Sequence, residues 1–264
     1  MTSSAPRLPS GRPEPENEVR LSFIDHLREL RVRVLHALYG VAVGMALVGW
    51  FVPQIRRWLL TPVIAALPEG DRTIKFTGAI DPVMNSVRIM LVGGIFVAAP
   101  WVLWQLWLFI APGLYKREKR MVLPFLFFGT LLFYAGAAFC YWLVMPQAFP
   151  AMLSFAADPI LEPMLTLDAQ YSLVLGMMLG FGVVFELPVV IAFLAMIGLV
   201  SGSFLARYRR HAIIANVALA AIITPTGDPI NLAIMAVPMI VFYEIGILLA
   251  RILGKKPAAG TGEP

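Results

Sequence analysis

Six apolar runs dominate this 264-residue sequence, and they constrain its fold more than any other feature. Most reach the roughly 20 residues that an α-helix needs to cross the hydrocarbon core of a bilayer. With 59% hydrophobic and only 14% charged residues, the chain is too apolar to cover a water-soluble domain with polar surface. We therefore predict an all-α, polytopic membrane protein of six transmembrane helices. The runs are residues 37–52, 87–111, 121–145, 171–200, 212–224 and 229–250.

Lysine and arginine are distributed unequally between the two sides of these spans. Sixteen of the 21 lie before the first run, in segments 116–120 and 207–210, or after the last run. The positive-inside rule then predicts that both termini are cytoplasmic, which an even number of spans requires. The basic residues cluster at the ends of apolar runs rather than on one soluble face, so we expect no nucleic-acid partner. The predicted location is a membrane that the chain crosses several times.

The polar segments suggest the domain organisation. Residues 1–17 are rich in Pro, Arg and Glu and are predicted to form a disordered cytoplasmic tail. Residues 18–251 form the membrane domain, and residues 252–264 a flexible tail. The outer segments 53–82 and 146–168 are long and are expected to form a structured cap.

The fifth run is unusually short. About 13 residues at ~1.5 Å rise span only ~20 Å, against a hydrocarbon core of ~30 Å. Two interpretations remain open: a helical hairpin supported by neighbouring helices, or a functional thinning of the membrane.

No residue pattern indicates an enzyme, a cofactor or a metal site. His26, His36 and His211 lack the i, i+4 spacing of a zinc-binding helix, and the single cysteine, Cys140, has no disulfide partner. No phosphate-binding loop with the GxxxxGK[ST] pattern is present either. Any driving energy must therefore come from outside the chain.

Two carboxylates on the predicted cytoplasmic side are candidates for binding a cation. Glu29 lies in HLRELRVR, residues 26–33, where it would pair locally with Arg33 or instead accept an incoming cation. Glu118 is embedded in the basic segment 115–120, where it would relieve repulsion or serve the same purpose. If the two converge, each would accept a planar guanidinium group, as recognition of paired arginines demands.

Three further acids lie in or near the spans. Glu186, in FELP, lies near the middle of the fourth span, where a carboxylate is costly and usually functional, and Pro188 is expected to kink the helix. Asp228, in TPTGDP, is expected to cap the sixth helix. Glu244 is expected to face the cytoplasmic headgroups.

Five motifs in this order resemble the TatC family, the core subunit of twin-arginine protein translocases. They are HLRELRVR at 26–33, FIAPGLY at 109–115, FGVVFELP at 181–188, the Thr-Pro turn with Asp228, and PM at 238–239 followed by YEIG at 243–246. The similarity runs from about residue 22 to residue 251.

The resemblance implies a cup-shaped six-helix receptor that binds twin-arginine signal peptides of folded cargo on its cytoplasmic face. It implies that Glu29 and Glu118 engage the two arginines. It further implies partner subunits of the single-span TatA and TatB type, other copies of the chain, and transport driven by the proton-motive force. The remaining residues that it singles out are Arg31, Phe109 and Lys116 near the peptide, Glu186 for partner subunits, and Pro62 and Asp228 on the outer side.

Two alternatives from other classes remain. A secondary transporter would use Glu186 as its proton or substrate site, but the sequence offers few other polar residues at that depth. A membrane scaffold without peptide specificity is opposed only by the paired acids and the family motifs.

Overall fold

The computed structural model describes residues 15–67, 74–110, 122–155, 164–223 and 229–254, and every regular element of this part is helical. The helices are α1 (Pro15–Gly49), α2 (Val52–Ala66), α3 (Asp81–Ile110), α4 (Val122–Phe139), the π-helical turn η3 (Cys140–Val144), α5 (Met145–Phe155), α6 (Leu167–Phe185), α7 (Leu187–Met196), α8 (Gly202–Arg207), α9 (Arg209–Ile223) and α10 (Pro229–Leu253).

Five continuous helical stretches among the described residues are long and apolar enough to span a membrane. They are Ile24–Gly49, Asp81–Ile110, Val122–Leu153, Leu167–Met196 and Leu232–Leu253. The 15-residue α9 supplies a sixth, shorter pass between α8 and α10. The six-helix prediction is therefore confirmed. The tails predicted before residue 18 and after residue 251 lie mostly outside the described part.

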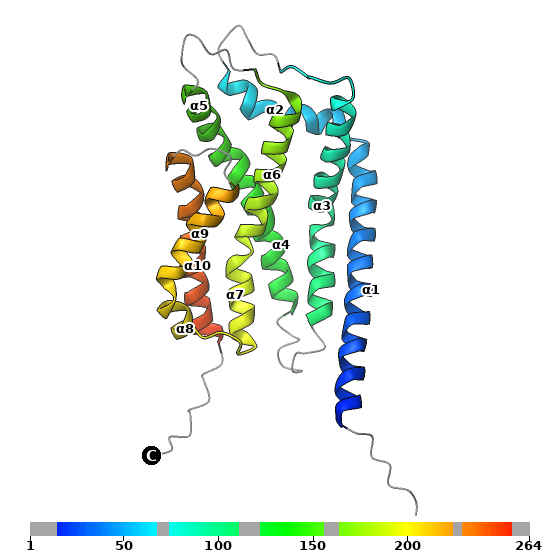
Figure 1. Ribbon diagram of the computed structural model, residues 1–264, viewed down its shortest axis with the longest axis vertical. Helices are drawn as coiled ribbons and strands as arrows, with labels where there is room; N and C mark the ends of the chain where they lie inside the picture. Colours follow the sequence, from blue (N-terminus) through cyan, green and yellow to red (C-terminus); the bar gives the residue numbers. More distant parts are fainter. Residues whose placement is uncertain (1–14, 68–73, 111–121, 156–163, 224–228, 255–264) are drawn as a thin grey trace, which may run out of the picture.

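The start of α1 and the end of α10 lie at the same end of the bundle (Figure 1). We call this the terminal end. At the opposite end, α2 lies across the tops of the long helices, and we call this the cap end (Figure 1). The folded structure predicted for the first outer segment is thus confirmed for residues 53–67. Near the cap end, Lys75 exchanges backbone hydrogen bonds with Leu165 and Leu167, which ties the two outer segments together.

Helices α1 and α3 lie side by side, with their backbones in close contact. A Cβ atom on Gly44 would lie only 2.5 Å from the carbonyl oxygen of Gly94, so both positions depend on the absence of a side chain. Because lipid provides no hydrophobic drive for helix association, small residues that let helices approach closely are the usual basis of such contacts.

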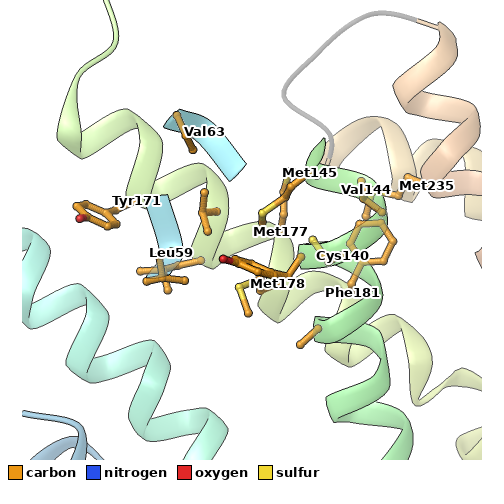
Figure 2. Close-up of a cluster of buried hydrophobic side chains, with 14 of the residues drawn as sticks. Leu59, Val63, Cys140, Val144, Met145, Tyr171, Met177, Met178, Phe181 and Met235 are labelled. Carbon is orange, nitrogen blue, oxygen red and sulfur yellow. The ribbon is translucent and has the colours of Figure 1, made fainter. Parts of the chain in front are cut away.

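The core lies where α2, η3, α5, α6 and α10 meet (Figure 2). Leu59 and Val63 of α2 pack toward Tyr171 and Met178 of α6, while Phe181 lies near Cys140 in the π-helical turn. This core anchors the cap to the long helices, which fixes the positions of residues at the cap end.

Candidate functional site

An aromatic contact joins α1 and α3 at the terminal end. The ring of His26 stacks on that of Phe109 with centroids 4.4 Å apart and planes 22° apart. Further along the same helix pair, Trp101 donates a hydrogen bond of 2.9 Å from its Nε1 to the backbone carbonyl of His36. The structure therefore brings together two motifs that are far apart in the sequence.

Glu29 lies beside this contact. It follows His26 by three residues, so the two side chains share a face of α1. Its Oε1 lies 3.3 Å from a terminal nitrogen of Arg33, and each side chain is 29% exposed. The local ion pair predicted from the sequence is therefore present. No hydrogen bond to Oε2 of Glu29 is found among the described residues, so this carboxylate retains acceptor capacity.

The other residues expected at this surface are not all brought together. Arg31 is exposed, and two residues along a helix place it about 200° around α1 from Glu29. Lys116 and Glu118 lie outside the described residues, on the segment that joins α3 to α4. Asp228 also lies outside them, between α9 and α10.

Glu186 lies at a break in the fourth span. α6 ends at Phe185 and α7 begins at Leu187, with Pro188 in its first turn, so the helix is interrupted next to the proline that was expected to kink it. The turn retains backbone hydrogen bonds on both sides, from the Glu186 amide to Val183 and from the Val190 amide to Glu186. Backbone hydrogen bonds therefore continue on both sides of the break.

The Glu186 carboxylate points at a position that lacks a side chain. A Cβ atom on Gly129 of α4 would lie 3.1 Å from its Oε2. Its Oε1 is buried and has no hydrogen-bond partner among the described residues. A carboxylate at membrane depth without a partner is costly, so this group either carries a proton or meets a polar group from outside the chain.

Pro62 lies at the cap end, away from both Glu29 at the terminal end and Glu186 in the fourth span. It is buried within α2 and lines a hollow of about 440 Å³ between α2 and the η3–α5 segment. The other residues that line it are Trp58, Thr61, Ala65, Ala66, Tyr141, Trp142, Pro146 and Pro150.

Sequence reasoning missed the aromatic junction next to this hollow. The rings of Trp58 and Tyr141 stack with centroids 4.0 Å apart, and the Tyr141 hydroxyl donates to the Trp58 carbonyl at 2.6 Å. The pair also lines a second, apolar hollow of about 350 Å³ that opens between α3 and α4. Nothing in the sequence pattern could have revealed it, because Tyr141 lies within an unbroken apolar run.

Glu244 was expected to face the headgroups. That expectation stays a prediction. Oε1 of Glu244 lies 2.7 Å from Nε of Arg209, in an exposed ion pair that joins α10 to the start of α9. Nearby, the Tyr243 hydroxyl donates to the carbonyl of Leu205 at 3.0 Å. These two contacts hold α8 and α9 against α10.

Comparisons with known proteins agree with the resemblance found in the sequence. The family model for TatC, the Sec-independent protein translocase protein, matches residues 25–238. A TatC protein of Koribacter versatilis is 38% identical over 238 residues, which cover 89% of this chain and 87% of the relative. A TatC protein of Helicobacter pylori strain J99 is 38% identical over 233 residues, covering 88% of this chain and 90% of the relative.

A solved structure shares the fold as well. A crystal structure of the twin-arginine translocase receptor TatC superimposes with a TM-score of 0.76 at 32% identity, covering 86% of this chain and 99% of that chain. A second crystal structure of the same receptor, in DDM, gives a TM-score of 0.76 at 31% identity.

Proposed function

This chain belongs to the TatC family and is a core subunit of a Sec-independent protein translocase, and from this premise we propose that it binds twin-arginine signal peptides of folded cargo. Family membership assigns it to protein transport rather than to catalysis. The proposed binding surface is at the terminal end. It consists of Glu29, Arg31, Phe109, Lys116 and Glu118.

The observation that carries the proposal is the contact between His26 and Phe109. It places the face of α1 that bears Glu29 next to the last turn of α3. An apolar ring beside a carboxylate suits an arginine, because the guanidinium stacks on the ring while its N–H groups donate to the acid. Oε2 of Glu29 supplies the acceptor.

The second acid comes from the segment that follows α3. Ile110 ends α3 one residue after Phe109, and Glu118 and Lys116 lie on the connection from there to α4. Two consecutive arginines need two acceptors, and Arg33 already occupies one oxygen of Glu29. We expect Glu118 to accept the second guanidinium, with Lys116 on the same segment. Arg31 would contribute from a different face of α1, about 200° around the helix from Glu29.

The charge distribution supports an orientation with both termini in the cytoplasm of a bacterium, in its inner membrane. The described basic residues at the terminal end include Arg28, Arg31, Arg33 and Arg251, and the positive-inside rule assigns this end to the cytoplasm. The cap end, with α2, would then face outward. Signal peptides presented in the cytoplasm would reach Glu29 directly.

Glu186 supports a proposal about partners. Its carboxylate, whose Oε1 has no hydrogen-bond partner among the described residues, would accept a hydrogen bond from a polar group of a single-span subunit of the TatA or TatB type. α9 and α10 would dock such subunits and further copies of this chain, with the proton-motive force driving transport. At the cap end, Pro62 would fix the course of α2 over the membrane, and Asp228 would cap α10.

Binding of a synthetic signal peptide to the purified protein tests the receptor proposal. Glu29→Gln and Glu118→Gln should each weaken binding of a twin-arginine peptide by about tenfold or more, because a hydrogen bond to a charged group contributes about 1.5 to 3 kcal/mol. Asp25→Asn is the matched control, since Asp25 is an exposed acid on the same helix that is paired with Arg28. Equal affinity for twin-arginine and twin-lysine peptides would refute the proposal.

The orientation is tested by thiol labelling in intact cells. The natural Cys140 is buried, so background labelling should be low. Phe76 and Ser203 are exposed near opposite ends of the bundle. An impermeant maleimide added outside should label Phe76→Cys and spare Ser203→Cys, and the opposite result would reverse the orientation.

A further inference from the structure

A short, folded corner at the terminal end carries a concentration of positive charge outside the proposed peptide surface. α8 and α9 meet at Tyr208, and the Ser201 hydroxyl caps α8 by accepting from the Phe204 amide at 3.1 Å. Gly202 is buried against Arg251 in the last turn of α10, where a Cβ atom would lie 2.5 Å from the Arg251 Cγ. We call residues 201–211 together with Arg251 the basic corner.

The charges of the basic corner are largely unneutralised. Arg207, Arg210 and Arg251 are exposed and make no ion pair within the described part of the chain. Arg209 is paired with Glu244, which is the sole carboxylate among described residues 199–223 and 229–254. The corner therefore presents three guanidinium groups without an ion pair, which favours binding of an anionic partner.

Aromatic and apolar side chains accompany these arginines. Phe204 and Tyr208 are 51% and 44% exposed and lie 4.7 Å apart between ring centroids. Leu199, just before the corner, is 71% exposed. Exposed aromatic rings beside arginines at the ends of apolar spans are typical of the boundary between hydrocarbon and headgroups. A water-soluble acidic partner would not require these exposed apolar groups.

The length of α9 also favours a lipid headgroup as the partner. Its 15 residues cover roughly 22 Å, less than the ~30 Å hydrocarbon core. A short span draws its flanking residues toward the headgroups, and long arginine side chains extend to reach them. The arginines at the start of α9 therefore lie where lipid phosphates are found.

We propose that the basic corner binds the headgroups of anionic phospholipids, with the phosphodiester oxygens accepting hydrogen bonds from Arg207, Arg210 and Arg251. This binding would hold the short α9–α10 hairpin at a fixed depth in the membrane. It is independent of signal-peptide binding, because it uses none of the residues at Glu29 or Phe109.

Spin-labelled lipids in nanodiscs test the proposal with the full chain. Wild-type protein in a phosphatidylcholine nanodisc should immobilise spin-labelled phosphatidylglycerol in preference to spin-labelled phosphatidylcholine. Arg207→Gln/Arg210→Gln should reduce this preference by fivefold or more, since each basic residue near an anionic surface contributes about fivefold. Arg207→Lys/Arg210→Lys should retain most of it, which separates charge from misfolding.

The matched control is Arg57→Gln/Lys75→Gln, which removes two exposed basic residues near the cap end. This control and Glu29→Gln should both leave the lipid preference unchanged. Inorganic phosphate should compete weakly, because it lacks acyl chains that position it at the corner. The proposal is overturned if wild type shows no preference, if the double glutamine variant keeps it, or if an acidic peptide protects the corner while anionic lipid does not.

Discussion

The carboxylate of Glu186 faces Gly129 across the junction of α4 with the α6–α7 break, where a Cβ atom would lie 3.1 Å from its Oε2. The glycine leaves room for the carboxylate without giving it a hydrogen-bond partner. The Oε1 atom is also unpartnered among the described residues. We therefore expect the hydrogen-bond partner of this carboxylate to come from another molecule.

This relationship predicts how Glu186→Gln should behave. Stability of the isolated subunit should change by less than about 1 kcal/mol, because no hydrogen bond within the described chain depends on the charge. Crosslinking to a single-span partner should fall severalfold. Thermal unfolding in detergent and site-specific crosslinking in membranes measure the two effects. A large loss of stability with intact crosslinking would show that the carboxylate has an internal structural role instead.

The α1–α3 contact predicts opposite effects for two glycine substitutions. Gly44→Ala should destabilise the protein by about 1 to 3 kcal/mol, because the added Cβ meets backbone of α3 that can yield only by separating the helices. Gly176→Ala is the control, since nothing lies within 4 Å of its added Cβ. It should be neutral or stabilising by up to ~1 kcal/mol through helix propensity. Equal unfolding temperatures for the two variants would contradict this account.

Phe109→Ala should weaken binding of a twin-arginine peptide by about two- to tenfold. The variant removes the ring that stacks on His26, and aromatic contacts contribute about 0.5 to 1.5 kcal/mol. Phe127→Ala serves as the comparison, since Phe127 is exposed on α4 at 63%. Peptide titration of both variants measures the effect. Loss of binding in both would indicate general unfolding rather than a local contact.

Salt should weaken peptide binding. The proposed contacts join guanidinium groups to partly exposed carboxylates, and charges are screened over only ~3 Å at 1 M salt. Glu29→Gln should bind more weakly at low salt and respond less to added salt, because one charged contact is already absent. Titrations at several ionic strengths give the two slopes. Identical slopes would show that Glu29 does not contact the peptide.

Several features could be predicted from the sequence because their causes are local. Apolar runs specify helical spans, since a backbone in lipid must satisfy its own hydrogen bonds within each segment. The ion pair of Glu29 with Arg33 follows from their i, i+4 spacing, and the break at Glu186 follows from Pro188. The family motifs supplied the candidate residues.

Only the tertiary structure decided which spans touch and through which residues. The stacks of His26 on Phe109 and of Trp58 on Tyr141, and the ion pair of Arg209 with Glu244, join residues that are distant in the sequence. In a soluble protein, each surface helix has a polar face toward water, and the apolar face opposite it identifies the buried side. Within a bilayer the lipid-facing side and the buried side are both apolar, so the packing partners leave no periodic signal in the sequence.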